Sequence, residues 1–457
     1  MENSGTAELA VDGLAGRSMD GIEAVAAARA DPAVLVPFVP RLVIDWIRES
    51  PEEPHRAVDG TIAFVDISGF TSMTERLARK GKVGAEEMHE ILDGLFTDLL
   101  AVAYDDGAGL VKWGGDAVLL LFDGPNHAAR ACRAALNMQR TIRRIGHLQT
   151  SVGRATLRMS VGIHSGAFDF FLLGDPTIHR ELVMAGPAVT ETVRMEQIAE
   201  AGEVAVSTAT AAAVDPTLLG PAKDAATLLR RAPQVPFLSA RPGPNTAGVD
   251  LATLVPVAVR EYLTQPREGF AEHRRITAAF LEFVGSDDLY AREGASALGR
   301  VIDECLRVVQ REALRHEVAF FETDVGRNAW RVMLIAGAPT SPGEDEDRML
   351  GAMRAVIEAD MPFPVRIGTN AGHVFAGYFG PKFRKTYSVK GDAVNLAARV
   401  MAKAEPGQLL ATASVLDPAS ALYTVTALEP FAAKGKRRPP LRIEGRAGAV
   451  ALRGPRA

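Results

Sequence analysis

The stretch TYSVKGDAVNLAARVMAK, Thr386 to Lys403, decides the fold of this chain, because a strand, a turn and a helix follow one another within it. A β-type run ends before Gly391, which supplies a turn, and a helical apolar periodicity follows. Asn395 and Arg399 are four residues apart and share one face of that helix. One interpretation is an amphipathic helix with a solvated Asn and Arg. The other is that both side chains point at a phosphate-bearing ligand, whose negative charge an arginine stabilises.

Similar sequence segments occur about two hundred residues earlier, and the separation between matched segments is nearly constant, as in a long-period repeat. The matched pairs are VGIHSGAF at Val161 with IGTNAGHV at Ile367, GPAVTETVR at Gly186 with GDAVNLAAR at Gly391, and EAGEVAVSTAT at Glu200 with EPGQLLATASV at Glu405. The chain is therefore predicted to hold two copies of one domain. Two copies can form an internal pseudo-symmetric dimer with two interface pockets.

The first copy alternates strands and helices. TIAFVDI, from Thr61, is an apolar strand, and the order β-α-β-β-α-β follows, with a further helix from Val189 to Ala199. We therefore expect an α+β fold. A proline-rich segment separates the copies. The predicted division is a leader and helix over 1–54, the first copy over 55–212, a linker over 213–272, the second copy over 273–445 and a tail over 446–457.

The amino-acid composition argues against several classes of function. The chain is 47% hydrophobic and 23% charged, an ordinary globular balance, and its net charge of -5 provides no general basic field for nucleic acid. Cys132 and Cys305 offer neither a disulfide framework nor a zinc spacing, which fits a reducing compartment. No signal peptide or uncharged apolar run of membrane-spanning length is present. We expect a soluble cytoplasmic protein without a nucleic-acid or membrane partner.

Two acidic residues of the first copy lie at predicted strand ends, Asp66 in FVDISGFT and Asp116 in KWGGDAVLLLF. Such a pair provides hard oxygen ligands for a divalent cation, with a nucleotide triphosphate and water completing the coordination. The backbone amides from Ser68 to Thr71 lead into a helix and could bind phosphates. Each aspartate alone is explained by turn chemistry. Only the combination predicts a metal-nucleotide site.

In order, FVDISGFT, KWGGDAVLLLF, VGIHSGAF and TYSVKGDAVNLAARVM resemble the class III adenylate and guanylate cyclase catalytic domain. The tandem arrangement resembles the soluble, bicarbonate-responsive adenylyl cyclases and their bacterial relatives. The likeness covers Asp59 to Ser207 and Arg274 to Val415. It implies two ferredoxin-like (βαββαβ) domains paired head to tail in a monomeric chain, with ATP between them. The implied reaction is attack of the ribose 3′-oxygen on the α-phosphate, giving 3′,5′-cyclic AMP and pyrophosphate.

The resemblance implies one complete pocket built from both copies. Asp66 and Asp116, with Ile67 beside them, match the residues that bind two ions of Mg²⁺ or Mn²⁺. Asn395 and Arg399 match the pair that orients the ribose and stabilises the pentavalent phosphorus, in accord with a chemistry that needs positioning and charge compensation. The implied nucleotide-binding residues are Ser68, Gly69, Phe70, Thr71, Ser388, Val389, Lys434 and Lys436.

The reciprocal pocket departs from the pattern and is expected to be degenerate. Its departures are Glu282 in place of Asp66, Thr323 or Asp324 in place of Asp116, and Thr190 in place of Asn395. Lys112 and Arg194 remain there, and in the bicarbonate-responsive relatives a matching pair holds the anion. This implies a regulatory site for bicarbonate or another small anion; the alternative is an ordinary structural Lys and Arg.

Other departures concern the catalytic pocket. Aligned on FFETDVG, Ala319 falls where the family places a Lys that reads the purine, and Ser388 holds the second base-reading position. Ser160 replaces a phosphate-binding Arg, for which Arg158 on the same strand face could substitute. Three hypotheses follow: an adenylate cyclase, a non-catalytic nucleotide or anion sensor, which Ala319 favours, and a weak enzyme with relaxed purine choice.

Overall fold

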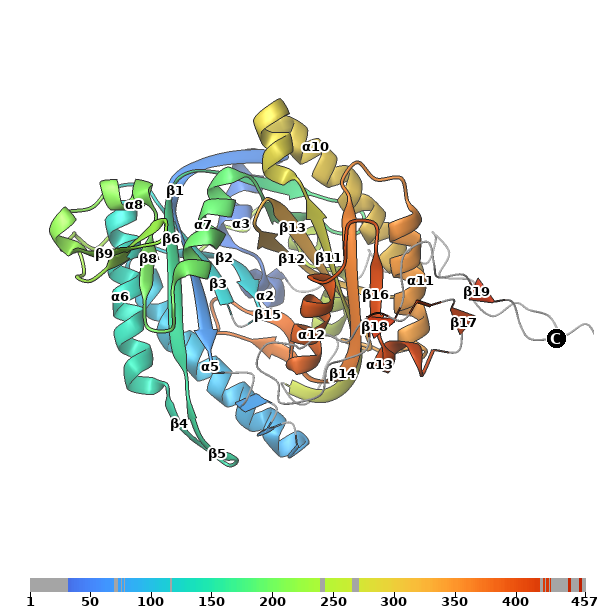
Figure 1. Ribbon diagram of the computed structural model, residues 1–457. Coiled ribbons are helices and arrows are strands. Elements are labelled where there is room, and N and C mark those ends of the chain that lie inside the picture. The colour runs from blue at the N-terminus through green and yellow to red at the C-terminus, as the bar shows by residue number, and fades with distance from the viewer. Residues whose placement is uncertain are drawn as a thin grey trace, which may run out of the picture.

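Two similar α+β halves lie side by side in the computed structural model (Figure 1). It describes residues 32–69, 73–74, 76–77, 79–115, 117–238, 243–264, 271–419, 422–423, 425–426, 428, 443–444 and 452–453. The predicted site residues that lie outside these ranges are Phe70, Thr71, Asp116, Lys434 and Lys436.

The first half confirms the predicted β-α-β-β-α-β order. Its elements are β1 (His55–Ser68), α5 (Lys82–Asp105), β2 (Gly109–Gly114), β3 (Ala117–Asp123), α6 (His127–Ile145) and β6 (Arg158–Leu173), followed by β7 (Glu181–Met184), α7 (Pro187–Ile198) and β8 (Val204–Val206). The sheet order is β2-β3-β1-β6-β8-β10-β9, and β7 pairs with β6. The short strands β4 (His147–Thr150) and β5 (Gly153–Thr156) form a separate ribbon.

The second half repeats this plan. Its elements are β11 (Ala271–Val284), α10 (Ser286–Arg315), β12 (Ala319–Gly326), β13 (Ala329–Ala336), α11 (Asp345–Glu358), β14 (Val365–Phe379), β15 (Thr386–Lys390), α12 (Asp392–Met401) and β16 (Leu409–Thr412). The sheet order is β12-β13-β11-β14-β16-β18, with β18 at Ile443–Glu444 and with β15 paired to β14. The predicted start of the helix at Asp392 is confirmed.

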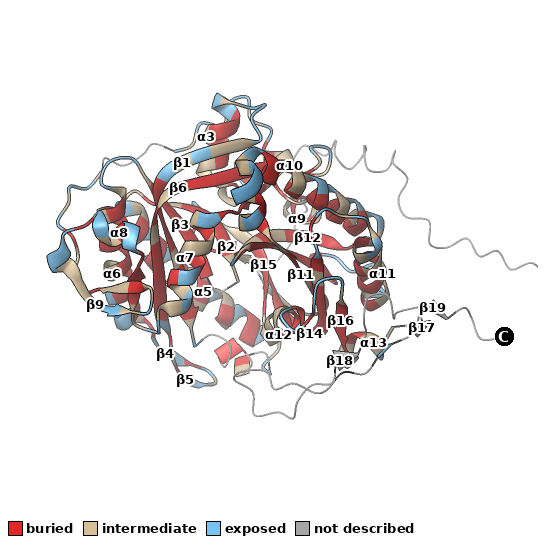
Figure 2. Ribbon diagram, turned by 45° about the horizontal axis from the view of Figure 1, so that its top comes forward, coloured by how far each residue is buried: buried red, intermediate tan, exposed pale blue. Residues whose placement is uncertain are grey.

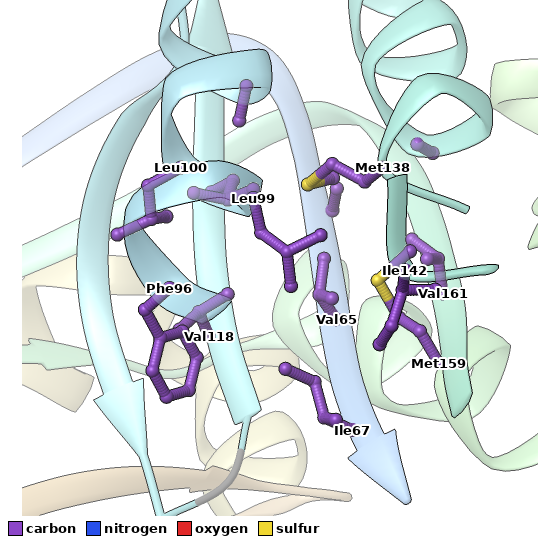
Figure 3. Close-up of a cluster of buried hydrophobic side chains, with 14 of the residues drawn as sticks. Val65, Ile67, Phe96, Leu99, Leu100, Val118, Met138, Ile142, Met159 and Val161 are labelled. Carbon is purple, nitrogen blue, oxygen red and sulfur yellow. The ribbon is translucent and has the colours of Figure 1, made fainter. Parts of the chain in front are cut away.

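Each sheet uses its two faces differently. In β1, Val65 and Ile67 point to the same side, where they contact α5 through residues such as Phe96 and Leu99 (Figure 3). Ile62 belongs to a different core, because successive strand residues point to opposite faces. That second core extends into the other half and includes Phe321 of β12. The sheets therefore bury one face under their own helices and the other against each other, and much of their strand length is buried (Figure 2).

Segments outside the two repeats complete this interface core. The helices α2 (Pro32–Leu35), α3 (Arg41–Glu49) and α9 (Val257–Thr264) supply buried residues to it, among them Ile44 and Tyr262. The Tyr262 ring lies 4.7 Å from that of Tyr387 in β15. The regions flanking the first copy thus stabilise the association of the copies by adding buried apolar area.

Part of the predicted linker belongs to the first sheet. The strands β9 (Leu219–Lys223) and β10 (Ala226–Leu229) form a hairpin, and Thr227 of β10 pairs with Val206 of β8. The first sheet therefore extends beyond residue 212, the boundary that its composition predicted; small residues hid the strand pattern. In the ranges that the structure describes, no helix has the length and apolar character needed to cross a bilayer.

Candidate active site

Strand register identifies which residues of the two copies are equivalent. The paired triplets are Phe64 with Gly162 and Leu119 in the first sheet, and Phe280 with Gly368 and Met333 in the second. Both glycines lie directly beneath a helix, since a Cβ there would come within 2.0 Å of the backbone nitrogen of Glu196 or Met401. Two residues beyond the triplet phenylalanines, Asp66 is therefore equivalent to Glu282.

The helix α12 presents Asn395 and Arg399 away from the core. Its opposite face is buried through Val394, Ala397 and Val400, whereas Asn395 and Arg399 are half-buried. The Nη1 atom of Arg399 is inaccessible to solvent and has no hydrogen-bond partner among the described residues. Leaving a buried guanidinium N–H without an acceptor is costly, so this atom favours a ligand that brings an anionic oxygen.

Asp66 lies half-buried near the end of β1, and its register neighbours are the uncharged residues Ala117 and Ser160. At the equivalent place in the second copy, Glu282 has two arginines as neighbours, Arg331 and Arg366. The carboxylate of Asp66 is a hard oxygen donor, a ligand type that suits Mg²⁺ or Mn²⁺. In the ranges described, no three His, Cys, Asp or Glu side chains gather as a metal site, and Asp116 lies outside them.

The loop after β1 requires glycine at position 69. Gly69 has φ +101°, and a Cβ there would approach the carbonyl oxygen of Thr156 to 2.5 Å. The preceding Ile67 is buried, which leaves its backbone rather than its side chain for a ligand. Ser68 pairs in register with Arg158, which is exposed. The structure thus brings Arg158 to the phosphate-binding segment that the sequence predicted.

Glu322, and not Ala319, is the equivalent of Lys112, so the alignment that placed Ala319 there is wrong, and Glu322 stands where the resemblance expects the residue that reads the purine. Lys112 pairs with Leu119, and Glu322 pairs with the equivalent Met333. Each strand also carries an irregularity just before these residues. The β12–β13 hairpin extends further than the β2–β3 hairpin, which ends at the Gly114 and Ala117 pair. Because the second hairpin is longer, no alignment without gaps brings both of its strands into register, and the alignment on FFETDVG falls three positions before Glu322.

Burial raises the pKa of Glu322 to about 8, and the neighbouring Asp324 raises it as well, although Lys390 and Lys112 act in the opposite direction. The second base-reading residue, Ser388, is buried in β15 and pairs in register with Gly377; Val389, which follows it, is buried too. At neutral pH, Glu322 is therefore chiefly an uncharged carboxylic acid, which can donate one hydrogen bond and accept another.

Comparison with known families agrees with this arrangement. Residues 52–225 and 348–443, more than half of the chain, match the model of the adenylate and guanylate cyclase catalytic domain. The chain belongs to this cyclase family. The match includes β1, β2 and β3 of the first copy and α12 of the second, the elements that carry the candidate site.

Individual relatives extend the comparison. Adenylate cyclase type 10 of Oryctolagus cuniculus is 24% identical over 401 residues, which are 77% of this chain and 24% of that protein. An uncharacterized protein of Mycobacterium tuberculosis is 35% identical over 157 residues, 33% of this chain and 28% of its own. This cyclase-family chain thus spans about a quarter of the length of these relatives.

Among solved structures, a class III adenylyl cyclase-like ATP-binding protein from Pseudomonas aeruginosa has a TM-score of 0.57 at 14% identity. The match covers 89% of this chain and 94% of that one. The shared fold therefore extends over both cyclase copies, as the ferredoxin-like tandem arrangement implies.

In the second pocket of the cyclase pair, protein groups replace the expected ligands. Glu282 is buried and accepts hydrogen bonds from Arg331 Nε at 2.8 Å and Arg366 Nε at 2.5 Å. The sequence predicted Thr323 or Asp324 as the counterpart of Asp116, and both are wrong, because Asp324 is equivalent to Gly114. Arg331 is equivalent to Ala117, so the counterpart of Asp116, which precedes Ala117, is Trp330. Trp330 is fully buried and stacks on Phe283 at 4.2 Å.

The other departures fit this picture. Thr190, the equivalent of Asn395, accepts a hydrogen bond from the backbone nitrogen of Asn328 in the second copy at 2.8 Å. Arg194, the equivalent of Arg399, is exposed and lies 3.3 Å from Glu191 on its own helix. These groups therefore already have partners within the protein.

The predicted anion-binding pair is not joined in the structure by any contact among the described residues. Lys112 Nζ lies 2.9 Å from Oε1 of Glu181, a residue to which sequence reasoning gave no role. Glu181 begins the short apolar strand ELVM and is far from Lys112 in sequence, so no local pattern marks it. Whether Lys112 and Arg194 bind a small anion stays a prediction.

Proposed function

We propose that this chain is an adenylate cyclase that converts ATP to 3′,5′-cyclic AMP and pyrophosphate at one pocket between its copies. The observation that carries the proposal is the buried Nη1 of Arg399, which has no acceptor among the described residues and shares a helix face with Asn395. An α-phosphate oxygen would satisfy it, most strongly when negative charge grows in the transition state. The similarity to rabbit adenylate cyclase type 10 over 77% of the chain supports the choice of reaction.

Each copy contributes a different part of this chemistry. Asp66 and Asp116, with the backbone of Ile67, would hold two Mg²⁺ or Mn²⁺ ions, which supply Lewis acidity for the 3′-hydroxyl and the triphosphate. The backbone from Ser68 to Thr71 would bind phosphate oxygens at the helix entry. Asn395 would orient the ribose, and Lys434 and Lys436 would contact the triphosphate. Because one chain supplies both halves, we propose a monomeric enzyme acting in the cytoplasm.

Glu322 gives a physical basis for reading adenine. The Watson–Crick edge of adenine presents an acceptor at N1 and a donor at N6, which match the O–H and C=O of an uncharged carboxylic acid. Guanine presents donors at N1 and N2, which match an ionised carboxylate instead. Since burial raises the pKa of Glu322 to about 8, the adenine-reading form predominates at neutral pH. GTP is the substrate that the same residue would favour once ionised.

A second candidate is a catalytically inactive module that binds a nucleotide or a small anion. It is favoured by the fold shared with the Pseudomonas aeruginosa protein, which is described as cyclase-like and ATP-binding. This candidate predicts binding of ATP without turnover for every divalent metal tried. A weak cyclase lies between the two and would show slow turnover with relaxed purine choice.

The deciding experiment supplies the purified chain with ATP and Mn²⁺ and detects the nucleotide product by mass spectrometry. Asp66→Ala is the catalytic variant, and Arg194→Ala, at an exposed residue of the other pocket, is its control. Loss of product in the first variant alone supports the enzyme. Nucleotide binding with no cyclic product from the unaltered chain favours the inactive module.

A further inference from the structure

A buried ion pair of the first copy lies beside the degenerate pocket and is hydrogen-bonded to the second copy. Lys112 of β2 donates to Glu181 Oε1 of β7 at 2.9 Å, and to the backbone and side-chain oxygens of Thr323 in β12 at 3.0 and 2.6 Å. The three N–H bonds of the ammonium group thus have three acceptors. The Lys112 and Glu181 side chains are only 6% and 12% exposed. Each charge therefore depends on the other for compensation.

Glu181 is bound by the second copy as well. The backbone nitrogen and the hydroxyl of Thr323 donate to its Oε1 at 3.1 and 2.8 Å. Its Oε2 lies 3.8 Å from the buried ring of His179. Burial alone would raise the pKa of Glu181, but the Lys112 charge and these hydrogen bonds outweigh burial and lower it. The carboxylate is consequently ionised at neutral pH and is shared between both halves of the molecule.

These contacts are the ones that a small dissociable anion would make. Bicarbonate, formate and acetate each offer paired oxygens that accept from an ammonium group, a hydroxyl and a backbone N–H. A cavity of about 100 Å³ adjoins the pair, and the charged residues lining it include Lys112, Arg180, Arg384, Glu181 and Glu322. Three cationic residues face two carboxyl groups there, so small anions are attracted to the cavity. The Lys112 ammonium, however, is already bound to a carboxylate.

We propose that Glu181 is a tethered anion: its carboxylate takes the place at Lys112 of a dissociable anion such as bicarbonate. The covalent link raises the effective concentration of the carboxylate far above that of any dissolved anion. The copies are thus held together at β7 and β12 without an external signal. We therefore expect the chain to be insensitive to bicarbonate, with Arg194 playing no part in anion binding.

The contact of the Lys112–Glu181 pair with β12 connects it to the nucleotide pocket. Thr323, which Lys112 and Glu181 both bind, directly follows Glu322 in the strand. Loss of the Glu181 carboxylate should therefore displace Glu322 and raise KM for the nucleotide more than it lowers kcat. This consequence rests on the proposed function. The anion substitution itself is measurable without activity.

The test is chemical rescue of Glu181→Ala, which leaves space for a small carboxylate beside an uncompensated Lys112. We expect the melting temperature to fall by roughly 5–10 °C, as for a broken buried ion pair. Formate, acetate or bicarbonate should then restore it saturably, whereas chloride at equal ionic strength should not. Rescue by bicarbonate alone, without formate or acetate, would indicate a site built for bicarbonate and would overturn the tethered-carboxylate account.

Two controls isolate the anion. Glu181→Gln fills the same space without charge, so we expect destabilisation that no anion relieves. Adding Lys112→Met to Glu181→Ala removes the cation and should abolish rescue. If Glu181→Ala does not fold, the proposal is tested by titrating the unaltered chain with bicarbonate. A saturable rise in its melting temperature or in its nucleotide affinity, which Lys112→Met abolishes, would contradict the proposal. Rescue of stability without any cyclic product would contradict the proposed function only.

Discussion

If Glu322 reads the base, the choice between ATP and GTP should change with pH. Burial raises the pKa of Glu322 to about 8, so about a tenth of this carboxyl group is ionised near pH 7 and about nine tenths near pH 9. The ratio of its acid form to its carboxylate form falls about a hundredfold over this interval. Only the acid form can donate to N1 of adenine, and only the carboxylate accepts from both the N1 and N2 donors of guanine.

The size of the change follows from the hydrogen bonds involved. One well-made bidentate contact to a base edge discriminates by about 1–3 kcal/mol, which is roughly 5- to 150-fold. We therefore expect the ATP-to-GTP ratio of kcat/KM to fall by on the order of tenfold to a hundredfold between about pH 7 and pH 9, because kcat/KM reports the ionisation of the free enzyme. Taking the ratio cancels pH effects on the metal ions and the 3′-hydroxyl, which both substrates share.

The assay measures cyclic AMP and cyclic GMP from parallel reactions across this pH range. Glu322→Gln is the matched control, because its amide offers a donor and an acceptor at every pH. That variant should lose the pH dependence of the ratio, because its amide does not ionise in this range. A flat ratio in the unaltered chain, or an equal slope in Glu322→Gln, would refute the assignment of Glu322 to base reading.

Three further predictions concern the two pockets. Arg399→Ala should lower kcat by roughly 10²–10³-fold with little change in nucleotide affinity, since its contact strengthens in the transition state; steady-state kinetics and ATP titration separate the two effects, and an unchanged kcat would contradict the role. Arg399→Lys should restore little, because an ammonium group lacks the forked geometry of a guanidinium; full activity would show that charge alone suffices. Glu282→Ala should reduce the free energy of unfolding by about 3–5 kcal/mol, because it leaves Arg331 and Arg366 without their buried carboxylate. Urea denaturation measures this loss, and a neutral effect would contradict the view that two arginines replace the metal in that pocket.

Local patterns were sufficient to predict the repeat and the α12 helix. The helix begins at Asp392, as predicted, because the turn at Gly391 and the apolar periodicity after it are adjacent in sequence. The order of strands and helices in each copy follows from similar local signals. Asn395 and Arg399 could likewise be assigned to one face from their spacing alone.

The remaining features depend on pairings between distant residues. Glu322 was missed because the length of the β12–β13 hairpin and its irregularity determine the register, and neither is visible in a gapless comparison. Glu181 meets Lys112 through pairings between distant strands of the first copy, and it meets Thr323 only where the two copies associate. Arg331 and Arg366 flank Glu282 from two different strands, so their compensation of its charge could not be read from either segment.

The most direct test of the central claim compares three proteins in one assay: the unaltered chain, Asp66→Ala and Arg399→Ala, each with ATP and Mn²⁺. Our account predicts cyclic AMP and pyrophosphate from the unaltered chain and at most traces from either variant, while all three retain the same melting temperature. Product formed equally by all three proteins, or by none of them despite bound ATP, would contradict it.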